Sequence, residues 1–135
     1  MRTILKISDA AVIALHAVDL MGKDPGHPRG TAALAGELGV SYNHLSKIMQ
    51  RLTKAGFVTP LRGPKGGFEL SGETGRARLR DIIEAIEGPL EFSDCLMGTK
   101  VCGRSGCLFS GLLTDINKRL GKLLSQKVSD FVKNN

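Results

Sequence analysis

The chain has 135 residues, of which 41% are hydrophobic and 24% charged, and its formal net charge is +6. This length suits one compact domain with a single core plus a short extension. No apolar stretch approaches the roughly 20 residues that cross a bilayer, and the N-terminus lacks the apolar run and cleavage site of a secretory signal. We therefore expect a cytoplasmic protein with no membrane segment.

The positive charge is concentrated in one part of the chain. Between residues 43 and 80, eight Lys or Arg residues stand against two Glu residues, and this difference of six equals the net charge of +6. A basic surface attracts nucleic acid by releasing condensed counterions, without specifying a sequence. A solvated basic face without a partner has the same composition, so charge alone does not establish DNA binding.

The first predicted helix begins near Ser8, whose side chain can cap it, and ends near Gly22. Residues 23–30 contain two prolines and two glycines, which cannot continue a helix, so an exposed loop is predicted there. The helix residues expected to face inward are Ala11, Val12, Leu15, Val18 and Leu20.

A helix-turn-helix pattern follows. Thr31 is predicted to cap a short helix, Gly39 to supply a tight turn, and Ser41 to cap the next helix. The inward face of that second helix is apolar: Leu45, Ile48, Met49 and Leu52. The outward face is polar and basic: Asn43, His44, Ser46, Lys47, Gln50, Arg51 and Lys54. Such a helix fits the major groove of DNA.

A β-hairpin is predicted next, because short apolar strands at residues 57–61 and 68–70 flank a Gly/Pro turn. A hairpin directly after a recognition helix is a wing, and the cations at its tip suit phosphate or a narrow minor groove. Within the recognition helix, Lys47 can reach guanine acceptors and Asn43 can pair with adenine, while His44 is either a phosphate contact or a bystander. For each of these side chains the alternative is a solvated surface position. The candidate DNA-binding residues are Ser41, Asn43, His44, Ser46, Lys47, Arg51, Arg62 and Lys65.

Two further helices are predicted. Residues 76–87 form an amphipathic pattern that ends at Gly88 and Pro89, with Leu79, Ile82, Ile83 and Ile86 inward. From Phe109 to Val132 apolar residues recur at helical spacing over about six turns, which predicts one long helix. A small domain has little core to cover such a stripe, so we expect a partner helix from a second subunit, with packing on its own domain as the alternative. The predicted fold is mainly α with a small β-hairpin.

The cysteines Cys95, Cys102 and Cys107 lie in a Gly-rich stretch. Three cysteines cannot all pair within one chain, and soft thiolates select iron-sulfur clusters, zinc or copper(I). The glycines allow the chain to wrap closely around a compact inorganic core. A structural zinc site and a reversible, peroxide-sensing disulfide are the alternatives.

Catalytic chemistry finds no support in the sequence. No set of nucleophile, base and orienting acid is recognised, and the Gly-rich residues 63–67 lie in a hairpin, whereas a phosphate-binding loop would open a helix. We therefore expect that the chain is not an enzyme.

Residues 45–58 (LSKIMQRLTKAGFV), 62–68 (RGPKGGF) and 81–89 (DIIEAIEGP), with the three downstream cysteines, resemble the Rrf-type winged-helix regulators of bacteria. That family includes the iron-sulfur cluster regulator IscR and the nitric-oxide-sensitive repressor NsrR, and the resemblance covers most of the chain. It implies a homodimeric transcription factor that binds a palindromic operator in double-stranded DNA. The resemblance also implies a winged helix-turn-helix domain at 1–90, a cysteine loop at 91–107 and a dimerisation helix at 108–135.

The same resemblance implies that the cysteine loop holds an iron-sulfur cluster, with a four-iron cluster favoured and a two-iron cluster as the alternative. The cluster would sense nitric oxide, redox state or iron-sulfur status and so control operator affinity, as in a repressor. Some family members without a cluster act through a partner enzyme, and a thiol switch is a related alternative.

The sequence departs from the family pattern at the cluster. Six residues separate Cys95 from Cys102 and four separate Cys102 from Cys107, where family members typically show five and five. The iron-sulfur cluster regulators carry a histidine shortly after the third cysteine, and no histidine follows Cys107 here. In the nitric-oxide-sensitive repressors an aspartate at the start of the first helix reaches across the dimer to the cluster, and Asp9 matches that position. The resemblance thus implies Asp9 as the fourth ligand. The alternatives are an Asp9 favoured only by the helix macrodipole, and Ser93 or Asp94 as other oxygen donors.

Overall fold

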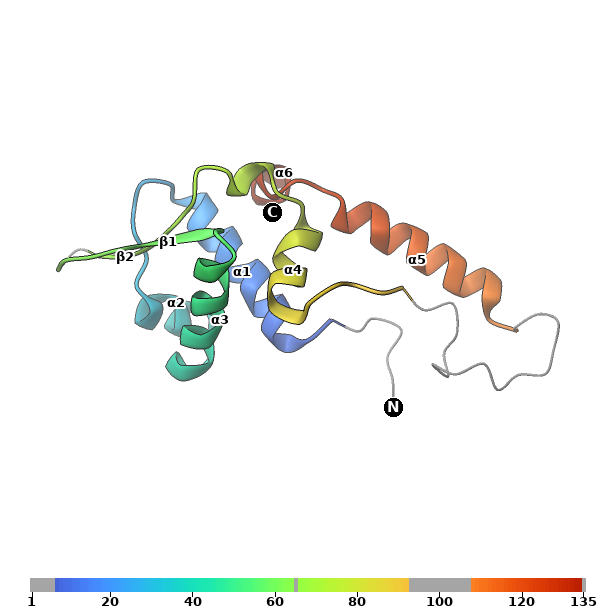
Figure 1. Ribbon diagram of the computed structural model, residues 1–135, viewed down its shortest axis with the longest axis horizontal. Coiled ribbons are helices and arrows are strands. Elements are labelled where there is room, and N and C mark those ends of the chain that lie inside the picture. Colours follow the sequence, from blue (N-terminus) through green and yellow to red (C-terminus); the bar gives the residue numbers. More distant parts are fainter. Residues whose placement is uncertain (1–6, 65, 93–107, 135) are drawn as a thin grey trace.

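The computed structural model describes residues 7–64, 66–92 and 108–134. This part of the chain forms a helical body with a small antiparallel hairpin projecting on one side and a long helix projecting on the other (Figure 1). In chain order the elements are α1 (Asp9–Lys23), α2 (Thr31–Leu38), α3 (Tyr42–Lys54), β1 (Val58–Leu61), β2 (Gly67–Leu70), the 3-10 helix η1 (Thr74–Arg76), α4 (Leu79–Glu87), α5 (Ser110–Leu124) and α6 (Val128–Asn134). The predicted fold class is confirmed.

Helix α1 lies at the centre of the core, in contact with α2, α3, β2, α4 and α6. The Ser8 hydroxyl accepts a hydrogen bond from the Ala11 backbone N–H at 3.2 Å, which confirms the predicted cap. The prediction that Val12 faces inward is wrong, since its side chain is 41% exposed. The neighbouring elements approach α1 along a face of smaller side chains, where Ala14 and Ala17 are fully buried.

The helix-turn-helix has the predicted turn and core. Gly39 adopts a φ of 67°, the left-handed conformation that ends α2, and Ser41 accepts a hydrogen bond from the His44 backbone N–H at 3.1 Å. The prediction that Thr31 caps α2 is wrong. The capping position is Gly30, which has no side chain to accept a hydrogen bond. The helix begins after Gly30 because residue 29 is held in a β-bridge to β2. The predicted core residues of α3 are all buried: Leu45, Ile48, Met49 and Leu52.

The hairpin pairs Val58 with Leu70 and Leu61 with Gly67, close to the predicted strands. Helix α4 begins at Leu79, three residues later than predicted, because residues 74–76 form a 3-10 turn instead. Thr74 anchors that turn by donating its buried hydroxyl to the Phe57 carbonyl at 2.7 Å. The predicted inward face of α4 is buried in full: Leu79, Ile82, Ile83 and Ile86.

The prediction of one continuous helix from Phe109 to Val132 is wrong, because the chain breaks between α5 and α6. At the break the Leu79 N–H donates to the Gln126 carbonyl at 3.0 Å, and the Val128 N–H donates to the Ala77 carbonyl at 2.8 Å. This short bridge turns the chain back, so α6 packs on α1 and η1 within the same domain while α5 extends away from the body (Figure 1). Across the described ranges, no helix combines the length and apolar character needed to cross a membrane.

Candidate nucleic-acid interface

The outward face of α3 is polar and exposed. Asn43, His44 and Lys47 are exposed, whereas Ser46 is half-buried. The Ser41 hydroxyl is already engaged in capping the helix, so its side chain positions the N-terminus of α3. These residues therefore present donors and acceptors from the end of the helix that enters a groove in this class of fold.

A shallow hollow of about 350 Å³ lies along the second half of the same face. Its lining combines cationic side chains with one amide, which gives the surface a positive potential suited to phosphate. The lining residues are Lys47, Gln50, Arg51 and Lys54. One of these cations has a protein partner, because the Nη1 atom of Arg51 donates to the Ile86 carbonyl at 2.9 Å.

The wing is attached to the body by backbone bonds. The Arg29 N–H donates to the Phe68 carbonyl and the Phe68 N–H donates to the Arg29 carbonyl, both at 2.8 Å, so the segment before α2 pairs with the outer edge of β2. Arg29 also forms an ion pair with Glu37 of α2. At the tip Arg62 is exposed, while Lys65 lies outside the described residues. The wing and α3 lie on the same half of the molecule, away from the free end of α5 (Figure 1).

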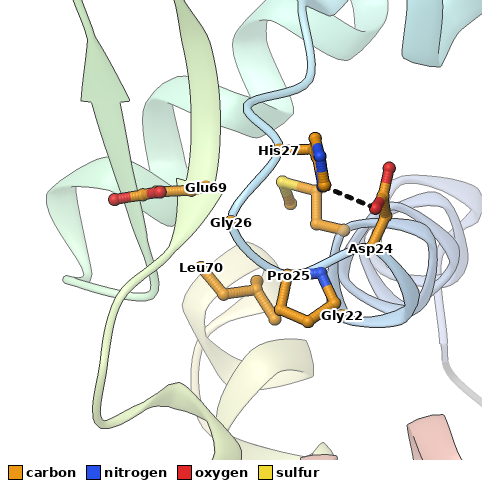
Figure 2. A pocket seen from close by; sticks show the side chains of 8 residues that line it. Gly22, Asp24, Pro25, Gly26, His27, Glu69 and Leu70 are labelled. Atoms are coloured by element: carbon orange, nitrogen blue, oxygen red, sulfur yellow. Dashed lines mark ion pairs between the residues drawn. The ribbon is translucent and has the colours of Figure 1, made fainter.

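A second, smaller pocket of about 130 Å³ lies between the loop after α1 and β2 (Figure 2). Asp24 and His27 form an ion pair at 2.8 Å across it, and Leu70 and Pro25 face each other below. Glu69 points away from the Asp24–His27 pair, so the three side chains do not converge (Figure 2). Within the described ranges, no group of three His, Cys, Asp or Glu side chains is arranged to hold a metal ion.

The predicted sensor residues fall into two groups. Cys95, Cys102 and Cys107, together with Ser93 and Asp94, lie outside the described residues. Asp9 is described: it is exposed in the first turn of α1, where a carboxylate is also favoured by the macrodipole.

The last turn of α4 joins the start of α1 to the segment that leads toward Cys95. The backbone N–H of Ser8 donates to the Glu87 carboxylate. Arg80 and the Leu90 backbone N–H both donate to the same oxygen of Glu84, at 2.8 and 3.1 Å. The hydrogen bond from Arg80, reinforced by the Leu90 N–H, lowers the pKa of Glu84 below its usual 4.5.

Two features of the interface were not predicted from the sequence. Tyr42, the first residue of α3, is 57% exposed beside the predicted DNA contacts. Helical periodicity does not single out Tyr42, but its position directly after the Ser41 cap indicates that it lies at the N-terminus of α3. The bond between Arg51 and Ile86 joins residues 35 apart in the chain, and no local pattern signals it.

The family of this chain is shown by its similarity to known proteins. The family model Rrf2, described as an iron-dependent transcriptional regulator, matches residues 7–134. The chain belongs to this family. It is a DNA-binding transcriptional regulator of the Rrf2 type, as the exposed basic helix-turn-helix and wing also indicate.

Individual relatives agree with this assignment. The HTH-type transcriptional regulator IscR of Xenorhabdus nematophila is 31% identical over 126 residues, which cover 92% of this chain and 75% of that protein. The IscR of Vibrio atlanticus is 27% identical over 109 residues, 80% of this chain, and the match spans only 63% of that protein. Among solved structures, CymR of B. subtilis, described as the global cysteine regulator of that organism, superposes with a TM-score of 0.77 at 25% identity, over 97% of this chain and 98% of CymR.

Proposed function

We propose that this Rrf2-type regulator is a homodimeric repressor whose operator affinity is controlled by an iron-sulfur cluster. The observation that carries the cluster assignment is the place of Asp9. Its exposed carboxylate stands at the start of α1, and the adjacent Ser8 is bonded to Glu87 at the end of α4, from which the chain continues toward Cys95. An exposed carboxylate is thus available at the start of α1 for the cysteine loop of a second subunit.

The donor set fits such a cluster chemically. Cys95, Cys102 and Cys107 supply three soft thiolates, the ligands that iron-sulfur clusters use, and Asp9 supplies a harder oxygen that holds its iron less tightly. A cluster bound there supplies an iron centre open to nitric oxide, oxygen or exchange. We favour a four-iron cluster, with a two-iron cluster as the alternative.

A second subunit is proposed to provide Asp9. In one subunit the start of α1 lies against the body, whereas the N-terminal end of α5, which begins at Ser110 three residues after Cys107, points away from the body (Figure 1). Helix α5 spans about 22 Å along its axis, given its 15 residues. Leu112 and Leu123 on α5 are 54% and 56% exposed, an apolar surface suited to a second copy of the helix.

DNA binding is proposed to use the exposed face of α3 and the wing. Lys47 and Asn43 reach base edges in the major groove, while Arg62 and Lys65 hold phosphate or the minor groove. Ser41 positions the helix, and His44 and Ser46, in the N-terminal half of α3, contact the DNA backbone. Two such units related by dimer symmetry fit a palindromic operator with a fixed half-site spacing.

The proposed coupling between the cluster and operator affinity uses residues that the structure describes. Glu84, Arg80 and Leu90 hold the segment before the cysteines against α4, and Glu87 holds the start of α1. A change at the cysteines or Asp9 therefore alters the end of α4, which packs against α3. A small shift in the placement of the two recognition helices costs about 1–3 kcal/mol of operator affinity, the usual size of allosteric coupling.

Anaerobic purification followed by visible absorption and native mass spectrometry tests the cluster and the dimer together. We expect a coloured dimer whose mass corresponds to an iron-sulfur cluster in each subunit. A colourless protein with zinc or no metal would overturn the cluster assignment.

A second candidate is a cluster-free regulator controlled by its thiols or by a partner enzyme. The superposition on CymR favours it, because it covers 98% of that protein, against 88% of the T. potens IscR structure. The same purification separates the two candidates, since disulfides and zinc are colourless. A thiol switch would appear as the loss of the mass of two hydrogen atoms per disulfide when the colourless protein is treated with a mild oxidant, which accepts the two electrons.

A further inference from the structure

We infer that Arg51 is a positioning residue that couples the recognition helix to the segment leading to the cysteines, rather than a DNA contact as the sequence predicted. This inference rests on the proposed function. Its basis is the hydrogen bond from Nη1 of Arg51 to the carbonyl of Ile86, together with the other bonds that meet at the last turn of α4.

The carbonyl of Ile86 belongs to the last turn of α4, where backbone carbonyls lack partners within the helix. Ile86 is 7% exposed, so its carbonyl requires a donor from the protein. The guanidinium of Arg51 supplies one at 2.9 Å, and its charge is favoured at the negative end of the helix. Arg51 thereby fastens the second half of α3 to the end of α4.

Four other hydrogen bonds meet within two turns of this point. The Glu87 carboxylate accepts from the Ser8 N–H, and the Glu84 carboxylate accepts from both Arg80 and the Leu90 N–H. Arg80 also donates to the Leu90 carbonyl at 3.2 Å. The end of α4 is therefore bonded to the helix that carries Asp9, to the segment that leads toward Cys95, and, through Arg51, to the recognition helix.

The other cations of the α3 hollow differ from Arg51. In the part of the chain that the structure describes, Lys47 and Lys54 have no hydrogen-bond or ion-pair partner, although both line the same hollow. The charge of Lys54 remains available to DNA phosphates, so Lys54, three residues along the same helix, is a matched control for Arg51.

The test compares Arg51→Gln and Lys54→Gln with the parent dimer. A duplex is first selected by the parent protein from a random-sequence library, and its affinity is then measured by fluorescence anisotropy between about 50 and 200 mM salt, a range over which phosphate contacts strongly affect affinity. Each protein is measured with its cluster and after the cluster is removed by chelation. Circular dichroism checks that each variant is folded, and Arg51→Met, which also removes the charge, replaces Arg51→Gln if the latter does not fold.

For Arg51→Gln we expect an unchanged slope of log affinity against log salt concentration. We also expect a several-fold fall in the ratio between the affinities measured with the cluster and after its removal. For Lys54→Gln we expect the slope to fall by about 0.9, the contribution of one phosphate, with the ratio unchanged. An Arg51→Gln protein that loses the same slope and keeps the parent ratio would overturn the inference. If the parent carries no cluster, the proposed function fails, and the salt slope alone then decides: an unchanged slope supports the positioning role and a reduced slope contradicts it.

Discussion

The backbone of Gly67 lies so close to Arg29 that a Cβ atom on Gly67 would stand 2.7 Å from the Arg29 carbonyl carbon and oxygen. Gly67 also adopts a φ of 154°, which other residues rarely adopt. This contact fixes the wing to the segment before α2, because Arg29 and Phe68 exchange two backbone hydrogen bonds beside it. Gly67 is thus needed for attachment of the hairpin to the body.

Substituting Gly67→Ala should lower the free energy of unfolding by about 1–3 kcal/mol, the scale of a strained backbone position. It should also weaken DNA binding, because the wing loses its fixed position. Urea denaturation measures the first effect.

The matched control is Gly36→Ala. Gly36 lies inside α2 with an exposed side and nothing within 4 Å of an added Cβ. This change should stabilise the fold by about 0.5–1 kcal/mol, because alanine favours a helix interior over glycine. Equal effects of the two substitutions would contradict the close packing at Gly67.

Substituting Lys47→Ala should relax base preference in the operator. An exposed lysine on the outer face of α3 that contacts guanine contributes about 1–3 kcal/mol of discrimination at its base pair. Affinity for a duplex changed at that base pair should therefore fall much less than affinity for the selected duplex. Competition binding with single-base variants of the selected duplex measures this difference.

Arg62→Ala is the control for this prediction. Because Arg62 stands exposed on the wing, its loss should weaken binding to all duplexes alike and reduce the salt slope by about 0.9. If Lys47→Ala and Arg62→Ala gave the same uniform loss, α3 would not read bases through Lys47.

Asp9→Asn should reduce cluster content, because an amide is a poorer ligand for iron than a carboxylate. The visible absorption per subunit of anaerobically purified protein, and its decay in air, report this loss. Asp130→Asn is the control, since Asp130 is likewise an acidic residue in the first turn of a helix, here α6. Both changes weaken a macrodipole interaction of about 0.3–1 kcal/mol, but only the first should affect the cluster. Equal cluster retention in the two variants would exclude Asp9 as a ligand.

Glu84 makes a contribution to stability that depends on pH. Its pKa is lowered in the folded state, chiefly by the hydrogen bond from Arg80, so the contribution is present above the ordinary value of 4.5 and is lost as the pH falls through the folded pKa below it. The stability difference between the parent and Glu84→Gln should therefore shrink as the pH is lowered through this range. Thermal unfolding at a series of pH values measures it, and a difference that is constant across the range would contradict the role of the carboxylate.

Local sequence signals were sufficient for most of the DNA-binding half of the fold, the cap of α2 excepted. Ser8, Ser41 and Gly39 act through hydrogen bonds or a backbone conformation within a few residues, and the buried face of α3 follows helical spacing. These features depend on nearby residues alone, so the sequence predicts them well. The prediction for Val12 was wrong because which face of α1 is covered depends on the elements packed around it.

The C-terminal region shows the opposite case. The apolar spacing from Phe109 to Val132 is regular, yet the helix ends at Leu124 because Gln126 and Val128 pair with the backbone of residues 77–79. Such a contact joins segments nearly 50 residues apart, and periodicity within one segment carries no sign of it. The bond between Arg51 and Ile86 is missed for the same reason, and the assignment of Arg51 as a DNA contact stays a prediction of the sequence alone.

The most direct test of cluster-controlled repression is the affinity of the anaerobically purified dimer for its selected duplex, measured by fluorescence anisotropy before and after nitric oxide is added. We predict that loss of the visible absorption is accompanied by at least about a fivefold change in affinity, the lower end of typical allosteric coupling. Loss of the absorption with no change in affinity would show that DNA binding is independent of the cluster and would contradict the proposed control.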